Sequence, residues 1–322
     1  MFGELPKVFD RDFAIAYFIP VAAFLAASLQ LLSGFGLVPG LETQLQQNLA
    51  IGTTVVGLVS WLIGVLLMAI NREIYRTLEG YGRFNPARLL GFLEKRRFQR
   101  LQAEIQALDD KYRAQLDGGE PFPREERLRR DRLMFQAARR FPEDESQLLP
   151  TAFGNCIRAF EVYPRVMYGV EAIQGWVRLL AFIPKEFRST LDSAKAQTDF
   201  WVNVIFLSIL YLIEYCVVAV YAHQMRSIWV PALALGIAWV ASYRARGSAI
   251  GWGEMVKASF DAFLPKLEKA VGFAPGSQEQ DRERWTRFSQ AIIYRLPELM
   301  PERSQPAPGT ENGGSIVGSE AD

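Results

Sequence analysis

Histidine and cysteine are nearly absent from this chain of 322 residues, which has one histidine, His223, and two cysteines, Cys156 and Cys216. One histidine excludes every metal site with two histidine ligands, and it excludes most catalytic dyads built on histidine. Cys156 lies in a charged region and Cys216 inside an apolar run, so neither is placed for a structural disulfide.

Enzyme signatures are missing as well. The sequence has no Walker-type Gly-Lys-Ser/Thr loop, no Gly-x-Gly-x-x-Gly beside a strand and no Gly-x-Ser-x-Gly elbow. No pair of aspartates lies in the apolar runs, where an intramembrane protease would need it. We therefore expect no enzymatic activity, no cofactor and no metal.

An excess of one charge is also lacking, since 36 basic side chains stand against 35 acidic ones. This balance argues against a nucleic-acid binder and against an enzyme for acidic substrates. The average conceals a segregation, because four windows carry almost no charge while residues 71–199 are dense in Arg, Lys and Glu.

What the chain does contain is long apolar runs, over 13–38, 49–70, 200–222 and 227–243. A helix needs roughly 20 apolar residues to cross a hydrocarbon layer of ~30 Å. The first three runs meet this requirement, and the fourth is at the short limit. A cleaved signal peptide is the alternative for the first run, but that run is long and a second span follows closely. We predict an all-α, polytopic membrane protein with about four transmembrane helices and a helical cytoplasmic domain.

The distribution of basic residues sets the orientation, because short cytoplasmic loops are rich in Lys and Arg. The 39–48 connection has neither, whereas Arg72 and Arg76 follow the second run and Arg244 and Arg246 follow the fourth. Both termini and residues 71–199 are therefore expected in the cytoplasm.

The cytoplasmic region is predicted to contain a helical hairpin over 94–140. Apolar residues with 3, 4, 3, 4 spacing form a heptad seam: Phe98, Leu101, Ile105, Leu108 and Tyr112. A Gly- and Pro-rich turn follows, and then a return helix over 124–140. A hairpin packed on itself and an intermolecular coiled coil both remain open.

A basic cluster of Lys95, Arg96 and Arg97 precedes this seam. Anionic lipid headgroups attract such clusters, with about 1 kcal/mol per charge near the surface. A solvated helix face is the simpler alternative. Acidic residues interleaved with the basic ones argue against nucleic acid: Glu104, Glu125, Glu126 and Asp131.

The segment 148–191 carries two more predicted helices. Thr151 is placed to cap a helix over 153–163 that Pro164 ends, and a second helix starts at Val170 and stops before Pro184. Asn155, Arg158 and Glu161 form a candidate polar cluster at the membrane surface. An ion pair between Arg158 and Glu161 on a solvated face is the alternative.

This segment resembles uncharacterised bacterial multi-span membrane proteins with a Leu-Pro-Thr…Gly-Asn…Arg…Glu…Tyr-Gly pattern. The matching positions are Leu149, Pro150, Thr151, Gly154, Asn155, Arg158, Glu161, Tyr168 and Gly169. The resemblance implies the class and a bacterial origin, hence the bacterial inner (plasma) membrane, and it implies no activity.

Glu214 is the costliest residue in the apolar runs, because a carboxylate inside a span usually faces a bundle interior or water. Tyr211 and Asn203 lie on roughly the same face of that helix. The three residues form a candidate intramembrane polar site that lines an ion or proton path. A protonated Glu214 that makes one interhelical hydrogen bond is the alternative.

Small residues form a stripe on the second run, at Thr53, Gly57, Ser60 and Gly64. Such a stripe permits close helix packing, within one chain or between chains. After the spans, residues 244–300 are predicted to form cytoplasmic amphipathic helices with a bend near Pro265. The tail 301–322 has few apolar residues and is expected to be disordered.

These observations favour a membrane-anchored interaction or scaffold protein that forms a homo-oligomer and binds a cytoplasmic protein partner. The alternative is a small oligomeric ion channel or transporter that uses Glu214.

Overall fold

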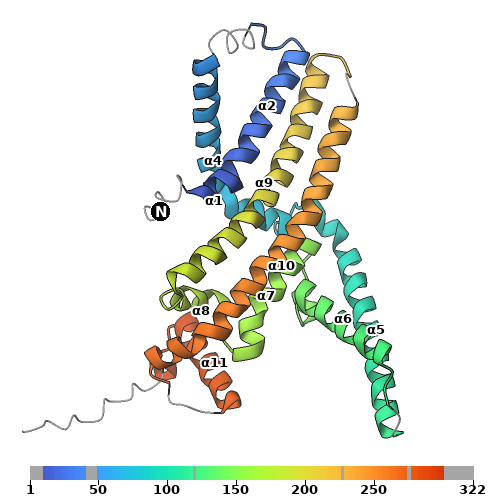
Figure 1. Cartoon of the computed structure of the whole chain (residues 1–322), viewed down its shortest axis with the longest axis vertical. Helices are drawn as coiled ribbons and strands as arrows, with labels where there is room; N and C mark the ends of the chain where they lie inside the picture. Colours follow the sequence, from blue (N-terminus) through green and yellow to red (C-terminus); the bar gives the residue numbers. More distant parts are fainter. Residues whose placement is uncertain (1–9, 41–48, 119–120, 226–227, 274–276, 301–322) are drawn as a thin grey trace, which may run out of the picture.

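The computed structural model describes residues 10–40, 49–118, 121–225, 228–273 and 277–300. It is all-α and 84% helical, with no strand among these residues. Apolar helices form one end of an elongated molecule, and shorter helices form the other end (Figure 1). The tail 301–322, which was expected to be disordered, lies outside the described residues.

The first apolar run is one continuous helical stretch with a local change of pitch. It consists of α1 (Arg11–Phe13), the π-helical η2 (Ala14–Phe18) and α2 (Ile19–Gly34). The stretch ends at Gly34, four residues before the predicted boundary, because Gly36 takes a left-handed conformation with φ +71°.

The second run forms α4 (Leu49–Glu79), which continues past the apolar residues into the charged region. The helix stops at Gly80, whose φ of +95° is left-handed. The two runs together account for two of the three helical stretches that are long and apolar enough to cross a membrane, Arg11–Gly34 and Ala50–Glu79.

The third such stretch is α9 (Lys185–Tyr221). The sequence predicted a transmembrane helix over 200–222. The helix that contains this run begins 15 residues before residue 200, at Lys185, so the predicted helix start is wrong. Charged residues lower the hydropathy of a segment but do not break its backbone hydrogen bonds, so the end of an apolar run is not the end of a helix.

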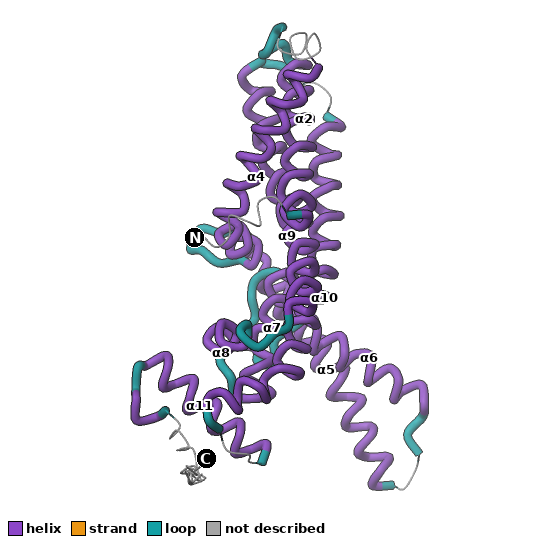
Figure 2. Tube along the Cα trace, turned by 60° about the vertical axis from the view of Figure 1, so that its left-hand side comes forward, coloured by secondary structure: helices purple, strands orange, loops and turns teal. Residues whose placement is uncertain are grey.

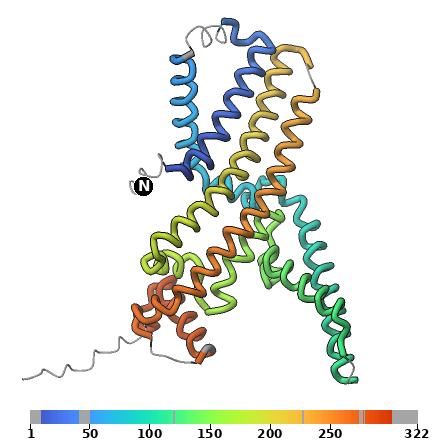
Figure 3. Tube along the Cα trace, in the orientation of Figure 1, coloured from blue at the N-terminus to red at the C-terminus, as the bar shows by residue number. Residues whose placement is uncertain are grey.

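The same correction applies to α10 (Trp229–Val271), the longest helix of the described chain. It joins the fourth apolar run to the first part of 244–300, where the sequence predicted separate cytoplasmic amphipathic helices. Pro265 lies inside α10 without ending it. The helix is not among the three membrane-spanning candidates, because Arg244 and Arg246 follow soon after its apolar part. In Figure 3, α9 (yellow) and α10 (orange) run side by side from one end of the molecule toward the other.

The hairpin expected over 94–140 is formed by α5 (Gly91–Asp117) and α6 (Arg124–Arg140). The 3-10 turn η3 (Pro86–Leu90) precedes it. The two helices point away from the rest of the molecule as an arm, which Figure 2 shows in profile. We call α5 and α6 the arm below.

Three shorter helices surround the lower part of α9 and α10: α7 (Ala152–Tyr168), α8 (Ala172–Leu179) and α11 (Gln278–Tyr294). The 3-10 turns η4 (Glu145–Gln147) and η5 (Pro297–Leu299) flank them. Thr151 caps α7 as predicted, accepting a hydrogen bond of 2.9 Å from the Gly154 N–H. The predicted stop at Pro164 is wrong, since α7 runs four residues further to the left-handed Gly169.

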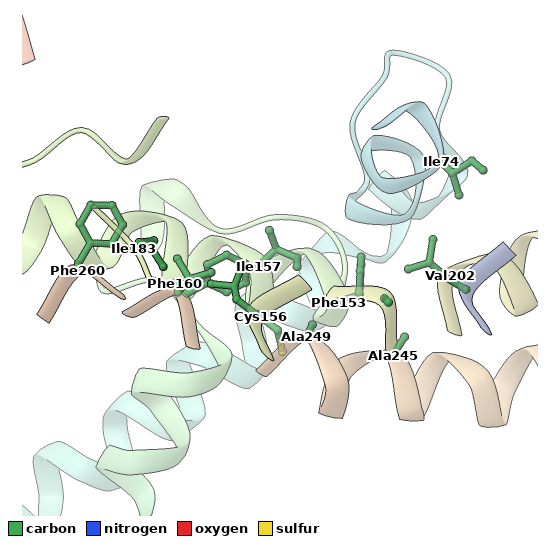
Figure 4. Packing of buried hydrophobic residues seen from close by; sticks show 14 of the residues in the cluster. Ile74, Phe153, Cys156, Ile157, Phe160, Ile183, Val202, Ala245, Ala249 and Phe260 are labelled. Carbon is green, nitrogen blue, oxygen red and sulfur yellow. The ribbon is translucent and has the colours of Figure 1, made fainter. Parts of the chain in front are cut away.

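One hydrophobic core continues from the apolar helices into the lower body. It begins at Phe13 and Val21, passes Phe153 and Phe160, and reaches Phe260. Figure 4 shows its middle part, where Val202 and Ala245 lie near Phe153 and the side chains of α7 continue toward Phe260. The core does not divide at the predicted boundary between membrane and cytoplasm, so the apolar helices and the lower body share one hydrophobic core.

Small residues recur every four positions on α10 and let α9 approach it closely. Ala241, Ala245 and Ala249 are at most 1% exposed, and Gly253 continues the series toward Phe160 of α7. A residue repeat of four follows one face of a helix, and small side chains on that face permit close contact.

Candidate functional site

The three residues of the candidate intramembrane site have different surroundings. Glu214 on α9 accepts a hydrogen bond of 2.6 Å from Ser28 Oγ on α2. Asn203 is fully buried, and its Nδ2 donates to the Ala16 carbonyl at 2.8 Å. Tyr211 lines an apolar groove of about 500 Å³ between α2, α9 and α10. The spacing along α9 placed them on one side, but each side chain faces a different partner.

The contact of Asn203 follows from a proline on the neighbouring helix. Proline has no N–H, so Pro20 gives no hydrogen bond to the carbonyl of Ala16, four residues earlier. The π-helical turn Ala14–Phe18 lies at the same place. Asn203 supplies a donor to this carbonyl from α9, and it therefore joins two helices at the point where one of them departs from α-helical geometry.

The small-residue stripe on α4 divides into two halves. Ser60 is fully buried, and a Cβ on Gly64 would come within 3.1 Å of Phe13 Cζ. In contrast, a Cβ on Gly57 meets nothing within 4 Å, and Thr53 is exposed. The inner half therefore packs within the chain against the first helical stretch.

The most densely bonded polar group lies at the lower end of the apolar helices, around Asp199. This carboxylate on α9 is 4% exposed. Its Oδ1 accepts hydrogen bonds from Tyr75 Oη at 2.7 Å and Asn71 Nδ2 at 3.2 Å, both on α4. Its Oδ2 accepts from Tyr17 Oη at 3.0 Å and from Lys195 Nζ at 2.7 Å.

Four donors from three helical stretches thus converge on one buried carboxylate. Burial of a carboxylate is costly unless its charge is paired and its oxygens accept hydrogen bonds. Lys195, one turn before Asp199, supplies the positive charge. The network holds η2, α4 and α9 together where the apolar runs end.

A cavity of about 1110 Å³ opens next to this network. Asn71, Tyr75 and Lys195 line one side of it, and Arg158 and Glu161 of α7 line another. Its remaining charged or hydroxyl-bearing lining residues are Arg72, Arg76, Glu79, Tyr81, Ser146, Arg165 and Glu171. Both signs of charge are present, so the cavity suits a polar molecule with mixed charge better than a simple anion or cation.

Arg158 and Glu161, two members of the candidate surface cluster, meet inside this cavity. Arg158 Nη1 lies 3.1 Å from a Glu161 carboxylate oxygen, and Arg158 also donates to Tyr81 Oη. Burial raises the pKa of the Glu161 carboxyl, and the neighbouring Arg158 guanidinium acts in the opposite direction. The expected (i, i+3) pair is therefore present, in a partly enclosed setting.

Asn155, the third member, lies elsewhere. It is fully buried, and its side chain accepts from the Leu149 N–H at 2.7 Å and donates to the Leu149 carbonyl at 3.0 Å. It fixes the loop before α7. Among the described residues, no group of three or more His, Cys, Asp or Glu side chains is placed to hold a metal ion.

The three consecutive basic residues before the heptad seam point to three different partners. Lys95 pairs with Glu145 at 2.7 Å, the Arg96 guanidinium lies 5.5 Å from the Phe92 ring, and Arg97 pairs with Glu94. Two of the three charges are therefore paired with carboxylates. Of the three, Arg97 alone lines a second polar cavity, of about 690 Å³, between the arm and the long helices.

Sequence reasoning missed the Asp199 network, although each donor carried a weak signal. Tyr17, Asn71 and Tyr75 are polar residues near the predicted cytoplasmic ends of apolar runs, where Asp199 also lies. Nothing in the order of the residues places these ends side by side.

The comparisons with known proteins add no family to this picture. No family model matches the chain, and no curated protein or solved structure shows significant similarity to it.

Proposed function

We propose that this protein is a membrane-anchored interaction protein that presents its arm to a cytoplasmic protein partner. The single observation that carries the proposal is the arm itself. Its two helices extend away from the body (Figures 1 and 2). Large apolar side chains on them are exposed. Exposed apolar side chains that gather on one face indicate a surface for another molecule.

The arm is braced from within. Phe98 packs on Phe141 at its base, with ring centroids 5.6 Å apart, and Tyr112 packs on Phe122 near its tip, at 5.1 Å. Ion pairs cross between the two helices along its length: Lys111–Glu126, Arg129–Glu104 and Arg130–Asp109. Because these contacts hold α5 to α6, the outer faces are left for other molecules.

The outer face of α6 defines the chemistry of the partner. Leu128 and Phe135 are 53% and 58% exposed, and seven residues, or two helical turns, separate them on one side of the helix. Of the seven arginines within Arg124–Arg140, Arg129 and Arg130 pair with α5 and Arg139 pairs with Glu254. Among the described residues, Arg124, Arg127 and Arg132 form no ion pair, so their charges are left for another molecule. The complementary partner has an apolar patch with an acidic rim.

The anchor is formed by the three apolar stretches, with α10 as the proposed fourth span. The basic residues that follow the second and fourth runs support a cytoplasmic location for the arm and for both termini. The resemblance to bacterial multi-span proteins supports the bacterial plasma membrane as the location. A homo-oligomer stays a prediction from the sequence.

Photo-crosslinking in intact membranes tests the proposal. A photoreactive residue is introduced in place of Leu128 or Phe135, and in place of Val177, which is exposed on α8, as a matched control. We expect one protein adduct from the two arm positions and none from the control. Reversal of the charges at Arg127 and Arg132 to Glu abolishes the adduct while the chain stays in the membrane.

Two outcomes would contradict the proposal. One is an adduct that forms equally from Val177, which shows no preference for the arm. The other is an adduct that contains only a second copy of this chain, which makes the arm a self-association element. Partner capture that survives deletion of residues 94–140 would likewise remove the arm from the interaction.

A further inference from the structure

A basic cavity lies where the arm joins the long helices. It has a volume of about 690 Å³ and takes lining residues from α5, α6, α7, α9 and α10. Arg97, Arg140, Arg244 and Arg246 line it, and Glu94 is the only acidic residue that does so. We call it the junction cavity.

The charge of the junction cavity is unbalanced. Glu94 pairs with Arg97, which leaves Arg140, Arg244 and Arg246. None of these three arginines forms an ion pair within the part of the chain that the structure describes. Three cations share one cavity whose one carboxylate, Glu94, is paired with Arg97, so they repel one another and an anion between them is favoured.

The floor of the cavity is buried and close to two of these cations. Cys156 of α7 lies there, 3% exposed. Burial raises the pKa of its thiol to about 11, while Arg140 and Arg246 act in the opposite direction. The arginines therefore act on the interior of the cavity as well as on its rim.

The position along the long helices identifies the source of the anion. The apolar part of α9 begins next to Trp201, and the apolar part of α10 ends at Tyr243, directly before Arg244. Arg244 lies 5.6 Å from the Trp201 ring centroid, and Arg246 lies 5.4 Å from that of Tyr243. Tryptophan and tyrosine gather at the level of lipid headgroups, and basic pockets between membrane helices on the cytoplasmic side receive anionic headgroups.

We infer that the junction cavity binds the phosphate-bearing headgroup of an anionic phospholipid. Arg140 of α6 and Arg244 and Arg246 of α10 hold the phosphate, and Trp201 and Tyr243 contact the interfacial part of the lipid. Leu101, Phe141 and Ile250 supply the apolar part of the lining. Because Arg140 belongs to the arm and the other two arginines to α10, the lipid also links the arm to the membrane. The inference does not rest on the proposed protein partner.

A thermal-shift titration tests this site on the full chain purified in detergent and stripped of lipid. Phosphatidylglycerol, phosphatidylcholine and inorganic phosphate are titrated separately, and unfolding is followed by tryptophan fluorescence. We expect phosphatidylglycerol to raise the unfolding midpoint and the other two to leave it unchanged. Each arginine removed lowers the affinity for phosphatidylglycerol about fivefold.

The variants are Arg140→Gln alone and Arg140→Gln/Arg244→Gln/Arg246→Gln. The control is Arg113→Gln/Arg127→Gln/Arg132→Gln, which removes three exposed charges from the arm outside the cavity. We expect the control to keep the response to phosphatidylglycerol. The cavity variants are expected to lose affinity in proportion to the number of arginines removed. Arg140 is exposed on α6, so its single variant gives a result even where the triple variant fails to fold.

Three results would overturn the inference. Equal stabilisation by phosphatidylcholine means that the headgroup charge is not recognised. Stabilisation by inorganic phosphate alone makes the cavity a site for a soluble anion. An equal loss in the control variant means that general charge, and not the junction cavity, attracts the lipid.

Discussion

The side chain of Asn203 on α9 donates a hydrogen bond of 2.8 Å to the carbonyl of Ala16, four residues before Pro20 on the neighbouring helix. The pair makes a proline tolerable deep in an apolar helix, because the carbonyl that proline leaves without its helical donor receives one from another helix. The effects of Pro20 and Asn203 on the free energy of unfolding are therefore coupled.

Substitution of both residues reveals this coupling. Asn203→Leu leaves the buried Ala16 carbonyl without this donor, and we expect it to cost about 1–3 kcal/mol. Pro20→Ala restores the backbone N–H, so the loss caused by Asn203→Leu is smaller in the double variant. Unfolding in detergent of the four forms measures the cycle. Additive losses would show that Asn203 acts independently of Pro20.

Asp199 is the acceptor that all its neighbours share, so its removal is expected to cost more than removal of any one donor. Asp199→Ala leaves Tyr17, Tyr75, Asn71 and Lys195 without this partner, and we expect a loss of about 3 kcal/mol. Tyr17→Phe removes one hydrogen bond and costs about 1 kcal/mol. Thermal unfolding of both variants in detergent gives the comparison. Equal, small effects would show that the network does not hold the helices together.

Gly253 and Gly251 on α10 differ in their surroundings, so alanine substitutions at the two positions distinguish the effect of packing on stability from the effect of helix propensity. A Cβ on Gly253 would lie 2.4 Å from Phe160 Cδ1, whereas a Cβ on Gly251 meets nothing within 4 Å. We expect Gly253→Ala to destabilise the protein by about 1–3 kcal/mol through overpacking. Gly251→Ala, the matched control, is expected to stabilise it by up to about 1 kcal/mol. Unfolding midpoints of the two variants decide, and a stable Gly253→Ala would contradict the tight contact between α7 and α10.

The free energy of unfolding is expected to depend on pH through the carboxyl of Glu161. Burial raises its pKa above the ordinary value, against the opposing effect of Arg158, so folding favours the protonated form. Below the ordinary pKa both states hold the proton and nothing is lost. As the pH rises through that value, the unfolded state releases its proton first, and stability falls until the raised folded pKa is passed.

We therefore expect Glu161→Gln to raise the unfolding midpoint at pH 7.5 and to leave it unchanged near pH 4. The control is Glu283→Gln, at an exposed residue on α11 that is also paired with an arginine. An equal rise in the control would show that loss of a charge, and not the surroundings of Glu161, causes the effect. A lower midpoint for Glu161→Gln at pH 7.5 would mean that the ion pair with Arg158 outweighs the cost of burial.

Substitution of Glu214 distinguishes a role of this residue in helix packing from a role in ion permeation. Gln at this position still accepts the hydrogen bond of Ser28, so we expect Glu214→Gln to keep the stability, and Ser28→Ala to cost about 0.6 kcal/mol. Thermal unfolding measures both. Ion flux through liposomes that contain the protein addresses the alternative function, and flux that disappears in Glu214→Gln would support a channel or transporter.

The apolar helices could be predicted because the length of an uncharged run is a local property. The arm could be predicted for the same reason, from a seam and a turn within 47 residues of sequence, over 94–140. The helix ends predicted at residues 200 and 243 were wrong, because α9 begins at Lys185 and α10 continues to Val271. A transition from apolar to charged residues changes the surroundings of a helix but does not break its backbone hydrogen bonds.

The polar contacts could not be predicted, since their partners are far apart in the sequence. Tyr17 and Asp199 are separated by 182 residues, and Ser28 and Glu214 by 186. Spacing along α9 grouped Asn203 with Glu214, but the partner of Asn203 is set by a proline on another helix. A pattern within one helix gives the face of a residue, and only the packing of the helices gives its partner.

The unbroken backbones of α9 and α10 have a mechanical consequence. With 37 and 43 residues, they are ~56 Å and ~65 Å long, about twice the ~30 Å thickness of a hydrocarbon layer. No loop separates the apolar parts of α9 and α10 from the lower body, and α10 ends beside α11, where Trp285 Nε1 donates to Glu268 at 2.8 Å. Each of the two helices therefore connects the apolar end of the molecule to the lower body without a break in its backbone. A tilt of a few degrees in their apolar parts displaces their far ends by several ångströms, so the angle of the apolar helices sets the position of the lower body.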